Sequence, residues 1–203
     1  METVQLELFK EAIPFKASKV SQESTNKFFL ATEGNKENIK VTALNGTEKQ
    51  ESPTVEFISF ETKKASKAEA ESLNIPTGSN IYKIYNKLGL NKKFYIVDKI
   101  IISQDKFPGL NEEIFKNRAN TIYNLYQNKF NIFITNCSEK LKAITSNEKI
   151  SKLLNIELGS PILKIDRIGQ TYHNETIEIR TSYVHTSDIE YIHSQNSTFG
   201  ESL

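Results

Sequence analysis

The sequence predicts an α+β domain, in which a mainly antiparallel sheet with flanking helices is built from two helix-strand-hairpin-strand repeats. Three observations predict this class: an internal repeat, a strand-like alternation of apolar and polar residues in each copy, and turn signals between the copies. We expect the domain to span residues 53–192 of the 203-residue chain.

The internal repeat is found when the sequence is compared with itself at an offset of 81 residues. Residues 73–84 (LNIPTGSNIYKI) then lie over residues 154–165 (LNIELGSPILKI), and eight of these twelve positions are identical. The shared Gly-Ser pair stands where each copy would turn from a helix into a strand. A chain of this length is expected to have one main core, so the two copies should share a sheet.

A short helix is predicted before each copy. Ser66 and Glu69 have the spacing of a capping box, in which the serine accepts from the backbone and the glutamate reaches back. Ser146 is expected to cap the helix of the second copy. The predicted buried residues of that second helix are Ile150, Leu153 and Leu154.

A strand, a polar hairpin and a returning strand are predicted after each helix. The hairpins fall at residues 89–92 and 169–174. The returning strands, residues 94–102 and 176–184, are rich in Ile, Val, Tyr and Thr, which suit a half-buried pleated surface.

Between the copies, the run FPGL at residues 107–110 requires a turn. A helix at about residues 119–128 and a strand at 131–135 should follow, and a strand at 55–61 should precede the first copy. The predicted buried face of the helix contains Ile122, Leu125 and Tyr126.

Residues 1–52 differ in amino-acid composition from the rest of the chain, because Glu, Lys, Asn, Ser and Thr dominate and apolar residues are scattered. Short strands are predicted at residues 28–30 and 39–41, joined by a turn at 33–35. Residues 193–203 are expected to form a disordered tail.

Composition excludes several classes of function. The 26 basic and 25 acidic residues give a net charge of +1, so no overall field attracts nucleic acid. The sequence has no apolar run near the roughly 18 residues of a membrane helix, and its first residues do not form a secretory signal. The lone cysteine, Cys137, suits a reducing compartment, so a cytoplasmic protein is expected.

The residues offer no catalytic, metal or cofactor site. No serine or cysteine lies in a nucleophile motif, and glycine-rich phosphate loops are absent. His173, His185 and His193 lack the spacing of a helix-borne metal pair. We therefore expect no enzyme activity, no metal and no cofactor.

With the repeat, the loop FPGL, the run GSPILKIDR and the following TIEI, residues 53–192 resemble the UTRA domain, the effector-binding half of HutC-type GntR bacterial transcription regulators. The resemblance implies a chorismate lyase-like fold, a homodimer, and a small-molecule effector bound in a pocket lined by both repeats. Such regulators carry a winged helix-turn-helix ahead of this domain. Residues 20–45 match at most its final wing and the linker, and the residues before them offer no two successive amphipathic helices.

The candidate ligand-binding residues lie mainly in the second repeat. Glu178 and Arg180 share one face of a strand because they are two residues apart, and Arg167 follows the preceding strand. By resemblance, the acidic position contacts polar groups of the ligand, and Tyr123 and Thr121 match a helix position whose hydroxyl reaches the pocket. Two alternatives stay open: the arginines can form structural ion pairs, and Tyr123 can be a core residue.

The first repeat departs from the family pattern. Sugar-phosphate-binding relatives place arginines there, whereas here those positions fall on Asn86 and Leu88, or on Lys87. Because the planar guanidinium fork is missing, an uncharged or carboxylate-bearing effector is expected rather than a sugar phosphate. The alternative functions are a structural or adaptor homologue that lost its ligand and, less favoured because arginines are few, a chorismate lyase-like enzyme.

Overall fold

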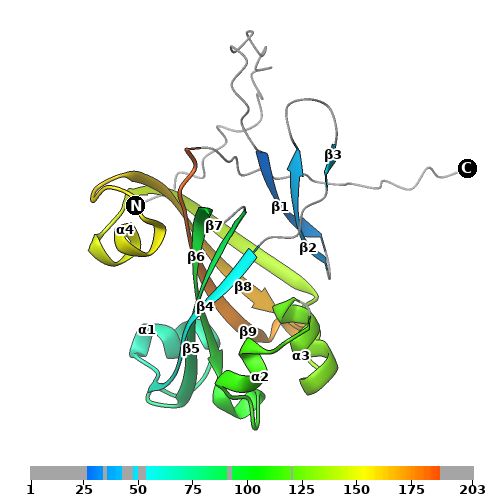
Figure 1. The fold of residues 1–203 in the computed structure, drawn as a ribbon. Helices are drawn as coiled ribbons and strands as arrows, with labels where there is room; N and C mark the ends of the chain where they lie inside the picture. Colours follow the sequence, from blue (N-terminus) through cyan, green and yellow to red (C-terminus); the bar gives the residue numbers. More distant parts are fainter. Residues whose placement is uncertain are drawn as a thin grey trace, which may run out of the picture.

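A computed structural model describes residues 27–33, 36–42, 48–49, 54–90, 93–119 and 121–187. Its largest element is a six-stranded antiparallel sheet of order β4-β5-β6-β9-β8-β7 (Figure 1). The six strands are β4 (Thr54–Lys64), β5 (Asn80–Leu90), β6 (Lys93–Ser103), β7 (Asn136–Thr145), β8 (Pro161–Gln170) and β9 (Thr176–Val184). A separate three-stranded sheet joins β1 (Lys27–Glu33), β2 (Lys36–Thr42) and β3 (Glu48–Lys49).

Short helices cover both faces of the six-stranded sheet (Figure 1). The helices are α1 (Lys67–Leu73), α2 (Glu112–Lys116), α3 (Ile122–Phe130) and α4 (Glu148–Leu154), with 3-10 turns η1 (Gln104–Lys106) and η2 (Tyr172–Asn174). Helices α1 and α4 pack on one face, and α2 and α3 pack on the other. We call these the α1/α4 face and the α2/α3 face. None of the helices in the described part of the chain has the length and hydrophobicity that a membrane crossing requires.

The two repeats have the same local structure. In the first, the Ala65 amide donates to the Ser79 carbonyl at 2.9 Å, and in the second the Ser146 amide donates to the Ser160 carbonyl at 2.8 Å. Each helix then ends at an asparagine in the left-handed region, with φ of 53° or 54°, and each following turn contains a glycine with φ of 81° or 83°. The left-handed residues are Asn74, Gly78, Asn155 and Gly159. The asparagine and glycine shared by the repeats are therefore required by backbone conformation.

The repeats meet at the centre of the sheet, where β6 pairs with β9. Helix α1 of the first repeat packs against β9 of the second, and α4 of the second packs against β6 of the first. Ile100 and Ile102 of β6 are fully buried on the α2/α3 face, against Phe115 and Tyr126. Each repeat thus completes the core of the other.

Most predicted elements are confirmed. The α+β class, the antiparallel sheet, the returning strand at 176–184 and the capping box of Ser66 and Glu69 are present as expected. The strands expected near 28–30 and 39–41 pair with each other as β1 and β2. The proposed domain limit at residue 192 and the tail from 193 lie outside the described residues.

Two predictions about the second half are wrong. Residues 131–135 form no strand; the strand is β7, which an apolar pattern could not reveal because this edge strand is largely exposed. Ser146 is not the cap of α4, since Asn147 Oδ1 accepts from the Ile150 amide while the buried Ser146 hydroxyl donates to the Glu157 carbonyl. The helix predicted at about residues 119–128 is confirmed as α3, and it begins after Thr121 because the Thr121 hydroxyl caps it by accepting from the Asn124 amide.

The matched turns of the repeats lead to a stability prediction. Gly78→Ala and Gly159→Ala should each lower the free energy of unfolding by about 1–2 kcal/mol, because an L residue is strained at positive φ. A Cβ at either position would meet no atom within 4 Å, so steric clash is not the cause. Urea denaturation followed by circular dichroism measures the effect.

The exposed neighbour Thr77 supplies the control, and Thr77→Ala should change the free energy of unfolding by less than about 0.5 kcal/mol. Equal losses for Thr77→Ala and Gly78→Ala would contradict the conformational explanation.

Candidate functional site

The α2/α3 face of the sheet carries a buried polar cluster that the strand register assembles. Rows of cross-strand neighbours on this face bring together residues that are distant in sequence. The row through Arg180 reads Ile84, Ile100, Arg180, Arg167 and Glu139, from β5 to β7. The row to one side reads Asn86, Asp98 and Ser182. The row to the other side reads Tyr82, Ile102, Glu178, Gly169 and Cys137.

Glu178 is the centre of this arrangement. Its side chain is 0% exposed, and its carboxylate accepts three hydrogen bonds. Tyr126 Oη donates to Oε2 at 2.6 Å, while Tyr123 Oη and Arg180 Nε donate to Oε1 at 3.3 and 2.8 Å. A buried carboxylate is tolerated only when it is paired and hydrogen-bonded in this way. We use the name Glu178 cluster for Asn86, Asp98, Tyr123, Tyr126, Glu139, Arg167, Glu178, Arg180 and Ser182.

Arg180 links Glu178 to a second acidic residue. Its Nη1 lies 3.8 Å from Asp98 Oδ2, and its guanidinium carbon lies 5.3 Å from the centre of the Tyr123 ring. Asp98 also accepts a hydrogen bond from the Ser182 hydroxyl. The guanidinium is thereby held by groups from β6, β9 and α3, and its direction is fixed.

Arg167 lies beside Arg180 in the same row, on the neighbouring strand. Its Nε is 2.6 Å from Glu139 Oε1, and both side chains of that ion pair are largely buried. Two positive groups directly opposite one another on adjacent strands repel each other. The sheet therefore holds two guanidiniums side by side on its α2/α3 face, and the surrounding carboxylates offset the repulsion between them.

Asn86 presents an unused hydrogen-bonding group at the edge of the cluster. The residue is 1% exposed, and its Oδ1 has no hydrogen-bond partner among the described residues. A buried acceptor without a donor typically costs about 1–3 kcal/mol. A bound molecule with an N–H or O–H group would relieve that cost.

The groups around Glu178 are suited to binding rather than to nucleophilic chemistry. Burial raises the pKa of both Tyr123 and Tyr126 well above the ordinary value, and the charge of Glu178 raises each further. Burial also raises the pKa of the Cys137 thiol, whose Sγ lies 3.7 Å from Tyr123 Oη. The hydroxyls and the thiol therefore stay protonated at neutral pH. Among the described residues, no group of three or more His, Cys, Asp and Glu side chains is placed to hold a metal ion.

A glycine makes room for the hydroxyl of Tyr123. A Cβ on Gly169 would lie 3.4 Å from Tyr123 Oη and 3.6 Å from the Glu178 Cβ. Because β8 lacks a side chain here, Tyr123 can reach over the strand to the carboxylate. The glycine thus supports the contact between α3 and Glu178.

Five of the seven residues predicted from the sequence meet in this cluster, and two do not. Glu178, Arg180, Arg167, Tyr123 and Asn86 come together on the α2/α3 face. The Thr121 hydroxyl instead caps α3. Lys87 follows Asn86 on β5 and points to the α1/α4 face, where its Nζ is 2.8 Å from Glu56 Oε1.

Sequence reasoning missed several members of the cluster. Tyr126 was expected only as a core residue, and Glu139 lies in a strand that was not predicted. Asp98 and Glu178 both lie on the α2/α3 face of a returning strand, but the offset of 81 residues sets Asp98 over Ile179, so the repeat did not reveal this correspondence. Ser182 had no signal, because its role arises only from its position opposite Asp98.

Comparison with known proteins agrees with this architecture. The UTRA domain family matches residues 48–190. A probable fructoselysine utilization operon transcriptional repressor of Escherichia coli strain K12 is 24% identical over 109 residues, which cover 54% of this chain and 44% of the repressor. The matched segment thus spans less than half the length of that relative.

Two solved structures show how far the fold is shared. The ligand-binding domain of a candidate GntR-family transcriptional regulator from Bordetella bronchiseptica has a TM-score of 0.69 and 26% identity, covering 71% of this chain and 92% of that one. A GntR-family regulator from Enterococcus faecalis V583 has a TM-score of 0.64 and 16% identity, covering 70% and 100%. This fold, the paired repeats and the family match over most of the described residues lead to one conclusion: the chain belongs to the UTRA domain family.

Proposed function

We propose that this chain is the effector-sensing domain of a GntR-type transcription regulator and that the Glu178 cluster binds the effector. Family membership and the likeness to a ligand-binding domain of the same class support the proposal. The observation that carries it is the fully buried Glu178, hydrogen-bonded to Arg180, Tyr123 and Tyr126.

A purely structural role accounts poorly for this cluster. Apolar residues of similar volume often stabilise a core as well as a buried ion pair does, or better. In that case, the two adjacent guanidiniums and the Asn86 Oδ1, which has no partner among the described residues, would destabilise the fold without serving a function. A polar ligand gives them a function, because it can donate a hydrogen bond to the amide oxygen and interact with the charged groups.

The charges of the cluster favour an uncharged or carboxylate-bearing metabolite over a sugar phosphate. The guanidiniums of Arg167 and Arg180 are already opposed by three carboxylates, those of Asp98, Glu139 and Glu178. This excess of negative charge would repel a doubly charged phosphate. A ligand with hydroxyl or ammonium donors and at most one carboxylate suits the same groups better.

The cluster also suggests how binding would be transmitted. Tyr123 and Tyr126 both lie on α3, and both donate to the Glu178 carboxylate. A ligand that donates to Glu178 competes with these hydroxyls and changes how α3 sits on the sheet. Displacement of α3 is therefore the step that we expect to couple effector binding to a DNA-binding partner domain.

Two other functions fit the site less well. A chorismate lyase-like enzyme would need cationic groups in excess to hold a polyanionic substrate, whereas carboxylates outnumber guanidiniums here. A structural homologue without a ligand would leave Asn86 Oδ1 without its partner. As a sensor for a transcription regulator, the chain would act in the cytoplasm.

Replacing the central carboxylate tests the proposed site. Glu178→Gln should weaken effector binding at least roughly tenfold, because each hydrogen bond to a charged group contributes about 1.5–3 kcal/mol. Calorimetry of the wild type against sugar phosphates, amino acids and small organic acids identifies the effector class, and the variant is then titrated with the best ligand.

Controls separate binding from folding. Glu175→Gln changes a carboxylate immediately before β9 that pairs with Lys106 outside the cluster, and it should leave affinity unchanged. Tyr123→Phe keeps the ring and removes one donor, so its loss should be smaller than that of Glu178→Gln. Tight binding of a sugar phosphate that Glu178→Gln does not affect would refute both the ligand class and the site.

We also expect a homodimer. Among the described residues, the outer strands β4 and β7 pair with a neighbouring strand on one side only, and such sheet edges are usually covered. Light scattering at tens of micromolar should give twice the chain mass of 23.2 kDa. A mass equal to one chain would contradict this expectation.

The chain alone should not bind DNA sequence-specifically, since its net charge is +1 and residues 1–52 show no pattern for a recognition helix. Gel-shift assays with promoter fragments provide the measurement. A specific complex that survives about 150 mM salt would show that the chain has a DNA-reading surface.

A further inference from the structure

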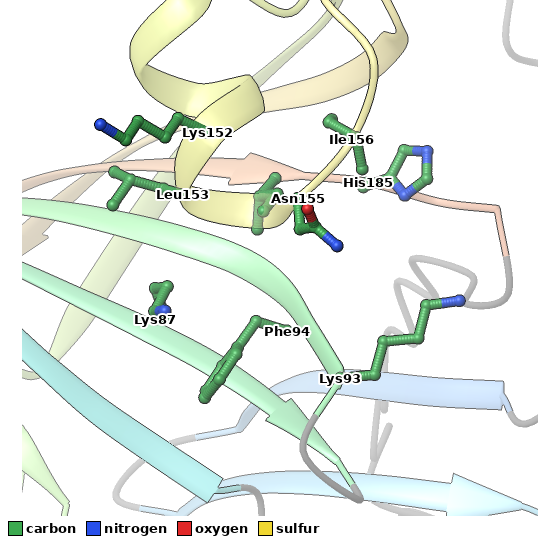
Figure 2. A pocket seen from close by; sticks show the side chains of 9 residues that line it. Lys87, Lys93, Phe94, Lys152, Leu153, Asn155, Ile156 and His185 are labelled. Atoms are coloured by element: carbon green, nitrogen blue, oxygen red, sulfur yellow. The ribbon is translucent and has the colours of Figure 1, made fainter.

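A pocket lies on the α1/α4 face, where the end of α4 meets strands β5 and β6 (Figure 2). Its volume is about 460 Å³, which is within the range of metabolite sites. Lys87 lines it, whereas the preceding residue, Asn86, belongs to the Glu178 cluster on the opposite face. The sheet therefore separates this pocket from the site proposed above.

The lining combines positive charge with apolar surface. Three lysines, a histidine and an asparagine contribute nitrogen atoms, and none of the nine lining residues is acidic. The apolar part consists of the Phe94 ring and the aliphatic side chains at positions 153, 154 and 156. Figure 2 shows residues of α4 and of the loop that follows it on one side, with β5 and β6 on the other. The nitrogen-bearing side chains are Lys87, Lys93, Lys152, Asn155 and His185.

The three lysines of the lining differ in their surroundings. Lys87 Nζ lies 2.8 Å from Glu56 Oε1 and 4.3 Å from the centre of the Phe94 ring, so one lysine is held in place by a carboxylate from β4. Lys93 Nζ lies over the Tyr95 ring at 5.2 Å. Lys152 is exposed in the last turn of α4. Since the nine lining residues include three lysines and no carboxylate, the lining itself is positively charged.

The internal repeat shows which lining residues the fold requires. Leu154, Asn155 and Ile156 recur in the first repeat as Leu73, Asn74 and Ile75, at the matching end of α1. The lysines do not recur. At the offset of 81 residues, Lys152 corresponds to Glu71 and Lys87 to Ile168. The same local structure thus forms without them, and the positive charge is particular to this pocket.

We propose that this pocket is a second ligand site, which binds a small organic anion whose phosphate or carboxylate is attached to an apolar group. The ammonium groups would meet the anion as point charges, and Phe94 and Ile156 would contact the apolar part. The site does not depend on the function proposed for the Glu178 cluster, because its residues lie on the other face of the sheet.

Titration of the full chain with model anions tests the site. Phenyl phosphate and benzoate represent the two anionic sources, inorganic phosphate carries charge alone, and benzyl alcohol carries the ring alone. At low ionic strength, phenyl phosphate, benzoate or both should bind saturably, with a Kd of about 1 mM or tighter. Amide chemical shifts should change at Phe94 and Asn155. Inorganic phosphate, which lacks the ring, and benzyl alcohol, which lacks the charge, should each bind at least roughly tenfold more weakly than the best aromatic anion.

Charge-reversal variants locate the binding. Lys152→Glu should weaken the best-bound anion at least roughly tenfold, whereas Lys152→Arg should retain it. Lys142→Glu, at an exposed position of β7 outside the pocket, makes the same change in net charge and should have less than about a twofold effect.

Three results would overturn the proposal. The first is the absence of saturable binding by a folded wild-type chain up to about 10 mM of either aromatic anion. The second is an equal loss for Lys152→Glu and Lys142→Glu, which would reveal a general charge effect. The third is a loss caused by Glu178→Gln but not by Lys152→Glu, which would place the anion in the Glu178 cluster instead and leave the function proposed for that cluster standing.

Discussion

The antiparallel pairing of β6 with β9 joins the two repeats, and both candidate sites depend on its register. This pairing sets Asp98 opposite Ser182 and Ile102 opposite Glu178, so that acidic residues from both repeats point to the α2/α3 face. Side chains alternate with a period of two along a strand, and a slip of one residue would turn Glu178 away from Tyr126. The apolar residues around Ile100 oppose that slip, because it would also expose them to water.

Within this frame, the Glu178 cluster concentrates charge where burial makes charge expensive. Each ionised group has partners: Glu178 has Arg180 and two tyrosines, and Arg167 has Glu139. Such a network is tolerated in a core when nearly every group is satisfied, and a single missing partner becomes costly. A ligand that exchanges even one of these hydrogen bonds can therefore change the energy of α3 on the sheet. This sensitivity is useful in a sensor and has no evident value in a scaffold.

The two faces of the sheet differ in the charge that they present. On the α2/α3 face, three carboxylates surround two guanidiniums, and the side chains of these five residues are largely buried. On the α1/α4 face, lysines gather at the end of α4, with one neighbouring carboxylate holding Lys87. Alternation along β5 produces this difference, because Asn86 and Lys87 are consecutive and point in opposite directions. One strand thus supplies each of the two sites with a residue.

The sequence by itself determined the repeat, the fold class and most of the strands, because apolar alternation and left-handed turn residues such as Gly78 and Gly159 are local signals. It also indicated Glu178 and Arg180, since residues two apart on a strand share a face. Strand β7 gave no such signal, because an exposed edge needs no apolar pattern, and Glu139 was missed with it. Only the tertiary structure placed Asn86 on the α2/α3 face, in the cluster, and Lys87 on the α1/α4 face. The physical reason is that the strand register is set by contacts between residues distant in sequence, and the register decides toward which face a side chain points.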